Sequence, residues 1–478
     1  MKIRLQLTVF TLVAFFLLFT LLSFDASRGN RVLAQQASAE IPPAGGGKFE
    51  SETKDLITDE QHRDMQAKLT ASIAKLTREG RLAPARPEIV SLSWPLRKAA
   101  GQPDFNVDST ANYVDQNPAY PDQLRDWNCG ARTYDQASGY NHQGTDIATW
   151  PFAWKKVDDN AVEVIAAAPG PIIQENDGNF DRNCGFNSLT PNAVYIRHAD
   201  GSVAWYLHMK SGSPTTKLVG DTVVAGEKLG VVGSSGSSTA PHLHFELYNA
   251  ANQLQDPFQG ACNTINAFSY WSSQESYRVS RINNLVTGSA PPVFPSCPTT
   301  ETTNEKTVFQ PGESVYTSIY YRDLQPSQTA QYSLLRPDGS TYQGTSQTFT
   351  STFDLSYYYY IWNLPPNGPN GTWKFRAVYN GVTYDRNFTV GAASPFATVS
   401  GRAVTSGGVG LRSSTVSLTN SQNVVRTATT SSFGFFTFDN VATNDTYTVR
   451  ILSRLYRYSP QTIQLMNNLT LPDFVGLE

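Results

Sequence analysis

The feature that most constrains this chain is the run PHLHFEL at residues 241–247, in which polar and apolar residues alternate. Alternation with period two predicts a half-buried β-strand. Because successive side chains of a strand point to opposite faces, His242 and His244 share one face and the apolar residues share the other. The histidine face has two interpretations. It is either a polar edge that faces solvent or a metal site, since neutral imidazole is the commonest side-chain ligand of zinc.

A second histidine motif favours the metal site. The chain has only six histidines, and His142 begins the sequence HQGTD, which ends at Asp146. In a straight strand, positions i and i+4 lie about 13 Å apart, whereas two ligands of one zinc each lie about 2 Å from it. If both residues bind one ion, the chain must turn between them, and Gly144 permits a turn. His142, Asp146 and one histidine of the 241–247 run would leave a fourth position for water, as in catalytic zinc sites.

The two motifs together point to a family. HxGxD at 142–146, followed by HLHFEL at 242–247, resembles the lysostaphin-type (LytM-like) zinc metalloendopeptidases, which hydrolyse peptidoglycan. That family has a further histidine on a strand between the two motifs, and the segment WYLHM at 205–209 supplies His208. The resemblance extends over residues 88–260.

The resemblance implies one Zn²⁺ per chain, held by His142, Asp146 and His244. It implies catalytic roles for His208 and His242, one in proton transfer and the other at the transition state, and which does which stays open. A zinc-activated water would then attack peptide cross-links of bacterial peptidoglycan. Glu246, on the same strand face, is expected as a partner of a zinc ligand rather than as a ligand.

Two other functions fit less of the sequence. A zinc-bound but non-hydrolytic regulator of another cell-wall hydrolase would share the fold, but such relatives usually lack ligands, and this chain has the full set. An adhesive surface protein would need none of the five site residues. The formal net charge of −3 gives no general attraction to nucleic acid or anionic membranes. The sequence therefore favours a hydrolytic enzyme, without indicating which peptide bond it cuts.

The amino terminus predicts export. The basic start MKIR precedes an almost unbroken apolar run from Leu5 to Leu22, which is typical of a signal sequence. The run is also long enough to remain as a membrane anchor, and small residues at 32–34 offer a cleavage site. Residues 1–34 are therefore interpreted as a signal peptide or membrane anchor. The body of the protein is expected to be periplasmic, on the cell surface or secreted.

Residues 35–87 predict a linker and a helix. The stretch 35–50 is rich in Ala, Gly, Pro and Gln, as in a tether. Thr58 begins the capping box TDEQ, apolar residues follow at helical spacing, and Gly80 is expected to end the helix. The narrow apolar stripe fits a helix packed on the zinc domain or on a partner, and equally a spacer helix. His62 is expected to be exposed.

The zinc domain is predicted at residues 88–298. Its long polar insertion at 101–140 either lines or covers the substrate groove. Asp200-Gly201 predicts a hairpin turn that places His208 at the end of the second strand, and His198 is expected to be structural or exposed. The Gly/Ser-rich stretch 233–238 is expected to be a flexible lip that leads into His242, because it lacks the features of a phosphate loop.

The four cysteines predict disulfides. They have no CxxC spacing, which argues against a structural zinc site in an exported chain. The expected pairs are Cys129 with Cys184 and Cys262 with Cys297, among the three pairings that four cysteines allow.

Two further β-domains are predicted after the zinc domain. Short strands and turns at 299–392 fit a β-sandwich of Ig-like type. Residues 397–478 resemble the carboxypeptidase regulatory-like domain, a small β-sandwich, in VSGR at 399–402 and FGFFTF at 433–438. Alternate tyrosines of the run 357–360 are expected to fill the sandwich core, although an exposed binding face is the alternative. The fold class is therefore mainly β: an antiparallel β-sheet zinc peptidase domain followed by two β-sandwich domains, with a short N-terminal helix. The ligand of the β-sandwich domains cannot be identified from their sequence.

Overall fold

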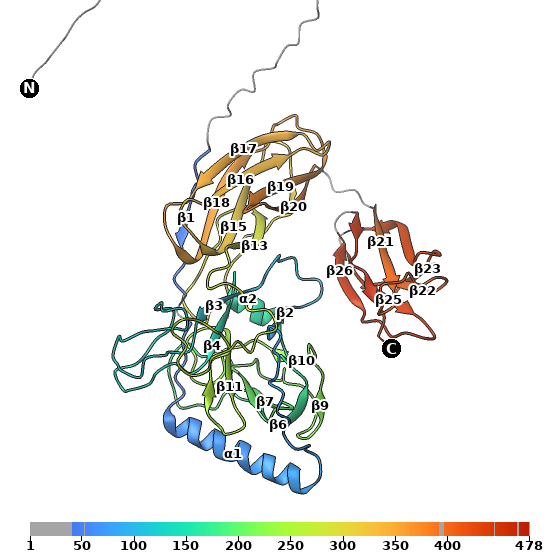
Figure 1. The fold of residues 1–478 in the computed structure, drawn as a ribbon. Coiled ribbons are helices and arrows are strands. Elements are labelled where there is room, and N and C mark those ends of the chain that lie inside the picture. Colours follow the sequence, from blue (N-terminus) through green and yellow to red (C-terminus); the bar gives the residue numbers. More distant parts are fainter. Residues whose placement is uncertain (1–40, 52, 392–395, 444, 466–467, 478) are drawn as a thin grey trace, which may run out of the picture. The chain divides into compact units, whose positions relative to one another are not determined.

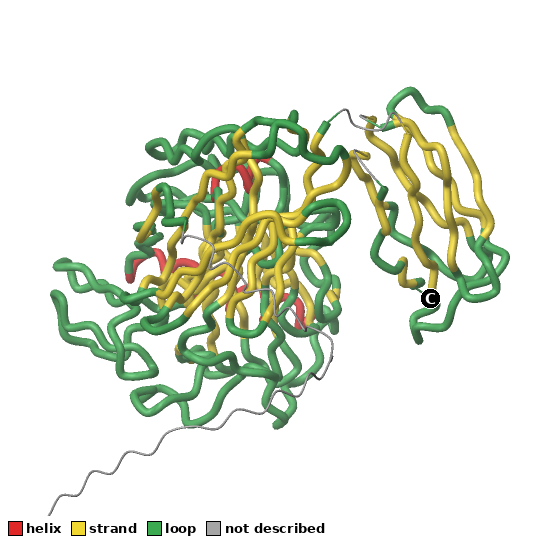
Figure 2. The backbone as a smooth tube through the Cα atoms, turned by 90° about the horizontal axis from the view of Figure 1, so that it is seen from above, coloured by secondary structure: helices red, strands yellow, loops and turns green. Residues whose placement is uncertain are grey.

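The computed structural model describes residues 41–51, 53–391, 396–443, 445–465 and 468–477. The signal sequence or anchor predicted at 1–34 lies outside these residues. Within the described ranges, no helix combines the length and apolarity needed to cross a membrane. Strands predominate there (Figure 1, Figure 2), and the two helices are α1 (Asp59–Arg78) and α2 (Ala153–Asp158). The prediction of a mainly β chain with a short N-terminal helix is confirmed.

The predicted zinc domain is built on an antiparallel sheet of eight strands. Their order is β3-β4-β11-β8-β7-β6-β9, and β12 pairs with β11. A three-stranded sheet, β10-β5-β2, shares an apolar core with it. The strands are β2 (Leu96–Lys98), β3 (Asp108–Asn112), β4 (Thr145–Thr149), β5 (Val162–Ile165), β6 (Gly170–Asn176), β7 (Ala193–Arg197), β8 (Val203–Leu207), β9 (Thr222–Val223), β10 (Lys228–Val231), β11 (His242–Tyr248) and β12 (Leu254–Gln255).

The strand predicted at 241–247 is β11, and its two faces divide as the alternation predicts. Its apolar residues Leu243, Phe245 and Leu247 join the core that also contains side chains of β5 and β8. His242, His244 and Glu246 lie on the opposite face, yet that face is fully buried as well. The expectation of a half-buried strand is therefore wrong, because α1 and the segment before it cover the polar face.

The predicted hairpin is formed by β7 and β8, which pair antiparallel around Asp200-Gly201. Gly201 has a φ of +87°, the left-handed conformation that a glycine adopts without steric cost. His208 follows β8 directly and also has a positive φ of 63°, which is uncommon for a residue with a side chain. His198 is buried and donates from Nδ1 to the carbonyl of Pro169 over 3.0 Å, which fits its expected structural role.

Helix α1 begins and ends at the predicted signals. The Gln61 N–H donates to the Thr58 hydroxyl, and the Thr58 N–H donates to the Gln61 side chain, which completes the capping box. Gly80 follows the C-cap residue with a φ of +71°. Leu69 and Leu76 pack into a cluster with side chains of β7 and β8, so the helix is docked on the sheet and is not a spacer.

The glycine-rich stretch predicted as a tether contains a strand, β1 (Gly45–Lys48), which pairs antiparallel with β18 (Phe353–Asn363). A Cβ atom on Gly45 would lie 2.5 Å from the Tyr359 hydroxyl, and Gly46 has a φ of +110°. The prediction of a tether is therefore wrong for residues 45–48, because the missing side chains allow this stretch to lie directly against a tyrosine of β18.

The first β-sandwich consists of two sheets, β1-β18-β15-β13 and β14-β20-β19-β16-β17. Tyr358 and Tyr360 face its core, as expected for alternate tyrosines, whereas Tyr357 contacts Phe294. Buried ion pairs join the sandwich to β3 and to the 101–140 insertion, through Arg322–Asp108 and Arg132–Asp323. The other strands are β13 (Arg281–Gly288), β14 (Val308–Phe309), β15 (Ser314–Leu324), β16 (Thr329–Leu335), β17 (Thr341–Thr348), β19 (Gly371–Tyr379) and β20 (Val382–Val390).

The last part of the chain forms a second pair of sheets with its own apolar core. The sheets are β24-β21-β27, with β28 paired to β21, and β23-β22-β25-β26. The strands are β21 (Phe396–Val404), β22 (Thr415–Asn420), β23 (Val425–Thr429), β24 (Phe435–Ala442), β25 (Asp445–Leu452), β26 (Gln461–Leu465), β27 (Leu469–Thr470) and β28 (Phe474–Val475).

All four cysteines form disulfides, but not in the expected pairs. Cys129 is bonded to Cys262, and Cys184 is bonded to Cys297. The Cys262 N–H donates to the carbonyl of Trp127, which places Cys262 beside the insertion that carries Cys129. The expected pairing is wrong because the chain folds back on itself, so cysteines more than a hundred residues apart meet (sequence separations of 133 and 113).

Candidate metal centre

The three predicted metal ligands meet because β11 lies between β4 and β8 in the sheet. The register places His244 opposite Asp146 on β4 and opposite Leu207, next to His208, on β8. His142 lies just before β4, on the other side of a bend at Gly144. A Cβ atom at Gly144 would come within 2.5 Å of the His244 ring, so this position needs glycine for space.

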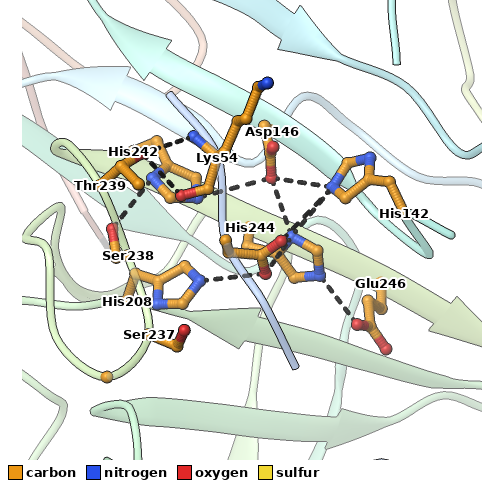
Figure 3. A network of polar contacts seen from close by, with 12 residues as sticks. Lys54, His142, Asp146, His208, Ser237, Ser238, Thr239, His242, His244 and Glu246 are labelled. Atoms are coloured by element: carbon orange, nitrogen blue, oxygen red, sulfur yellow. Dashed lines mark hydrogen bonds and ion pairs between the residues drawn. The ribbon is translucent and has the colours of Figure 1, made fainter. Parts of the chain in front are cut away.

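The facing atoms of these residues are as close as ligands of one ion. His142 Nε2 lies 3.1 Å from Asp146 Oδ1 and 3.3 Å from His244 Nδ1, and the Asp146–His244 distance is 2.8 Å. Two ligand atoms of a tetrahedral zinc, each 2.0–2.1 Å from it, are about 3.3 Å apart. All three side chains are fully buried, and Figure 3 shows them converging.

Hydrogen bonds on the outer side of each ring fix which nitrogen faces the cluster. His142 Nδ1 donates to the Tyr113 carbonyl over 2.7 Å, and His244 Nε2 donates to Glu246 over 2.8 Å. When each ring carries a proton only on this outer nitrogen, it presents a lone pair to the Asp146 carboxylate and to the other ring. Lone pairs gathered in this way repel one another unless a cation lies between them, so the donor set fits a metal ion such as zinc.

The electrostatics of the cluster favour positive charge. Burial lowers the pKa of His244, but the carboxylates of Asp55, Asp146 and Glu246 outweigh burial and hold it well above its ordinary value. Burial raises the pKa of Glu246, but His62 and His244 lower it to about 2. The carboxylates are thus ionised in a site without solvent, where they attract a proton or a metal ion.

His208 and His242 form the other half of the site. Each donates from Nδ1 to a backbone carbonyl, His208 to Ser235 over 2.6 Å and His242 to Ala240 over 2.7 Å. The ring centroids are 4.7 Å apart. His242 Nε2 is buried without a hydrogen-bond partner among the described residues, 3.5 Å from Asp146 Oδ1. Burial lowers the pKa of His242 to about 4, so its ring is neutral at neutral pH and can accept a proton.

The structure also brings in two residues that the motifs do not indicate. Asp55 reaches the cluster from the segment before α1, with Oδ2 3.0 Å from His244 Nδ1. His62, expected to be exposed, is buried, and its Nε2 lies 2.9 Å from the same Glu246 oxygen that His244 contacts. That expectation is wrong because α1 docks with His62 toward β11. Asp55 lies outside any motif, so the sequence gives no signal for it. His62 is one of only six histidines, and this scarcity was the one signal that could have pointed to it.

Residues 140–257 match the profile of peptidase family M23. This segment contains the five residues His142, Asp146, His208, His242 and His244. It does not contain Asp55 or His62.

Individual relatives are similar over comparable lengths. The peptidoglycan DD-endopeptidase ShyC of Vibrio cholerae is 29% identical over 152 residues, which are 29% of this chain and 30% of ShyC. The glycyl-glycine endopeptidase ALE-1 of Staphylococcus capitis is 30% identical over 123 residues, 25% of this chain and 29% of ALE-1. The chain thus spans less than a third of the length of these relatives.

A solved structure is also similar to part of the chain. The catalytic domain of the antimicrobial peptidase lysostaphin from Staphylococcus simulans is 29% identical and covers 26% of this chain and 83% of that domain, with a TM-score of 0.19. The match of residues 140–257 to the family profile indicates that the chain carries a segment of M23 peptidase type. ShyC and ALE-1 are endopeptidases at low identity to it.

Proposed function

We propose that this protein is an exported zinc metalloendopeptidase that hydrolyses peptide cross-links of bacterial peptidoglycan. The observation that carries the proposal is the convergence of His142, Asp146 and His244 at ligand distances, with the Nε2 atoms of two further histidines on the same side. The M23 match and the endopeptidase relatives support the same chemistry.

In this proposal, His142 Nε2, Asp146 Oδ1 and His244 Nδ1 hold the zinc. When bound, zinc would lower the pKa of a water molecule and polarise the scissile carbonyl. Asn112 donates to Asp146 Oδ2 over 2.8 Å, which orients the carboxylate, as Glu246 orients His244.

The two remaining histidines would handle the proton and the developing charge. Their Nδ1–H groups are occupied by backbone carbonyls, so the Nε2 atoms are the ones that face the site. His242 Nε2 has no hydrogen-bond partner among the described residues, whereas His208 Nε2 lies 3.3 Å from Asp55 Oδ2. One Nε2 accepts the proton of the attacking water and the other, once protonated, stabilises the oxyanion of the tetrahedral intermediate. The neutral ring of His242 suits the first role, although both histidines meet its geometric requirement.

The remaining parts of the chain are assigned by the same proposal. The two disulfides support export, because such bonds persist outside the cytoplasm. The C-terminal sheets at 396–477 are proposed to be the carboxypeptidase regulatory-like domain, which would space or target the enzyme on the wall. Linked modules of this kind raise the local concentration of an enzyme on an insoluble polymer.

One observation favours a second function, a zinc-bound but non-hydrolytic regulator of another wall hydrolase. The Asp55 carboxylate lies beside the cluster, where a catalytic zinc keeps a position for water. A digestion experiment separates the two functions. Purified peptidoglycan is incubated with the zinc-loaded full chain, and separately with its Asp55→Ala variant. New amino termini are identified by mass spectrometry.

We expect new termini from at least one of the two proteins, and none when His208→Ala is added to the same protein. Zinc bound at one equivalent without new termini from either protein would support the regulator. Absence of bound zinc would contradict both functions.

A further inference from the structure

The segment that precedes α1 follows a defined path across the molecule. We call residues 41–51 and 53–58 the strap. It starts with the Ile41 N–H bonded to Thr345 of the first sandwich, and continues as β1 along the edge of β18. Phe49 then packs against Trp150 and Phe294, with ring centroids 4.5 and 4.8 Å away. Beyond this anchor the strap crosses the histidine face of the central sheet and runs into α1.

At the histidine face, the strap is joined to the Gly/Ser-rich lip by one isolated antiparallel β-bridge. Asp55 forms a bridge with Ser238, the Thr239 N–H donates to the Lys54 carbonyl over 3.0 Å, and the Leu56 N–H donates to the Ser237 carbonyl over 3.4 Å. Figure 3 shows Lys54 beside Thr239 and Ser238. Backbone hydrogen bonds of this kind also hold extended peptides in binding grooves, so the strap lies where a peptide substrate could bind.

The bridge between Asp55 and Ser238 places the Asp55 carboxylate beside the metal cluster. Its Oδ2 lies 3.0 Å from His244 Nδ1 and 3.3 Å from His208 Nε2, and its Oδ1 lies 3.9 Å from His142 Nε2. Ligand atoms of Asp55, His142, Asp146 and His244 all lie within 4.8 Å of one another. The 3.0 Å separation of Asp55 Oδ2 from His244 Nδ1 is close to the ~3.3 Å between two ligand atoms of one tetrahedral zinc.

Asp55 is held in place by residues at the end of the 101–140 insertion. Its N–H donates to the Tyr134 hydroxyl over 2.8 Å, and the Tyr140 hydroxyl donates to its Oδ1 over 3.0 Å. The Tyr134 hydroxyl also contacts the carboxylate. Asn112 Nδ2 donates both to Asp146 and to the strap carbonyl of Thr53. The insertion therefore secures the strap, which in turn covers the site.

We propose that Asp55 is a fourth protein ligand of the zinc, and that the strap thereby keeps the centre closed until it is displaced. The proposal rests on the zinc centre of the proposed function and adds its regulation. Two carboxylates and two neutral imidazoles balance the charge of Zn²⁺ and complete its four positions. Four protein ligands are typical of structural zinc sites, whereas catalytic sites keep one position open. The same segment covers both the metal ligands and the backbone of the lip beside them.

The test uses the full chain and three variants: Asp55→Ala, Asp55→Asn and, as a matched control, Asp64→Asn. Asp64 lies on α1, is exposed, and pairs with Lys68, away from the cluster. Zinc affinity is measured by competition with a chromogenic chelator. Both Asp55 variants are expected to bind one zinc at least about 10-fold more weakly than the wild type, the smaller end of what metal-site changes cost. The control is expected to match the wild type.

Hydrogen exchange followed by mass spectrometry gives a second readout that is independent of activity. In the wild type and in Asp64→Asn, adding zinc is expected to slow exchange of the amides of residues 53–58. In Asp55→Ala this zinc dependence should disappear, and hydrolysis of a small soluble cross-link peptide should increase. If zinc binds at one equivalent but neither its affinity nor strap exchange depends on Asp55, the proposal is overturned while the zinc centre stands. If no zinc binds to any of these proteins, the proposed function itself fails.

Discussion

The two faces of β11 are both buried, but different parts of the chain bury them. Leu243, Phe245 and Leu247 are covered by strands of the same domain. They belong to the apolar core that these strands form together. His242, His244 and Glu246 are covered by the strap and α1, which come from outside the M23-like segment. Burial of the apolar face stabilises the fold, because removing apolar surface from water is favourable. Burial of the polar face costs free energy, which specific hydrogen-bonded and ionic partners from the strap and α1 offset.

The largest effect is expected on the apolar face. Phe245→Ala should lower the free energy of unfolding by about 3–5 kcal/mol, because it leaves a cavity in the core. His242→Ala on the polar face should cost less, about 1–3 kcal/mol, because it mainly removes the hydrogen bonds of Nδ1 to the Ala240 carbonyl and the Ser238 hydroxyl. Both are measured by denaturant unfolding of the full chain. Equal losses would mean that the two faces are not distinguished by how they are covered.

On the polar face, zinc binding and turnover should separate. His244→Ala is expected to lose the zinc, since it removes a ligand, while the chain stays folded. His208→Ala is expected to keep the zinc and to lower turnover by about 10²–10⁴-fold, the range for a proton-transfer or charge-stabilising group. Both substitutions are made in the protein that also carries Asp55→Ala. Metal analysis then measures zinc binding, and hydrolysis of a soluble peptide measures turnover. Equal zinc loss in both variants would contradict this division of roles.

The contact between α1 and the polar face should depend on pH. Burial lowers the pKa of His62, but the Glu246 carboxylate 2.9 Å away raises it above its ordinary value. A raised folded-state pKa stabilises the fold below the unfolded pKa of about 6.5, and this stabilisation is lost as pH rises through the folded pKa. His62→Ala should therefore cost about 1–3 kcal/mol at pH 6 and less at higher pH.

His198→Ala serves as the control for His62. His198 is also buried, but it donates to a neutral backbone carbonyl, so a smaller loss of about 0.5–1.5 kcal/mol is expected. Burial lowers its pKa, so the variant should not lose stability preferentially at low pH. Urea unfolding at pH 6 and pH 9 compares the two variants. A pH-independent cost for His62→Ala would show that its pair with Glu246 is not ionic.

The smallest effect is expected from the part of the chain farthest from the site in sequence. Residues 396–477 have a separate apolar core and supply none of the cluster residues. Removing 396–478 should change the hydrolysis of a soluble peptide less than about 2-fold while slowing digestion of intact wall, because only the local concentration on the polymer changes. If the shortened chain is folded and zinc-loaded yet loses activity on the soluble peptide, the C-terminal sheets contribute to the site.

Local patterns determined the elements that carry the site. Period-two alternation located β11 and assigned its faces, the Asp200-Gly201 turn located the β7–β8 hairpin, and the capping box located α1. The spacing of His142, Gly144 and Asp146 indicated that the chain turns, and the bend is present. These features depend on residues within one turn or strand, so a sequence contains all the information that they require.

Only the tertiary structure decided what covers the site and how its distant parts are joined. The roles of three residues follow only from their neighbours in the fold. Gly45 lies against Tyr359, Asp55 lies beside His244, and His62 lies beside Glu246. The disulfide pairs likewise depend on which loops meet, and no spacing rule gives them. Each of these contacts joins residues more than a hundred positions apart, where packing of the whole chain, rather than any local preference, sets which groups become neighbours.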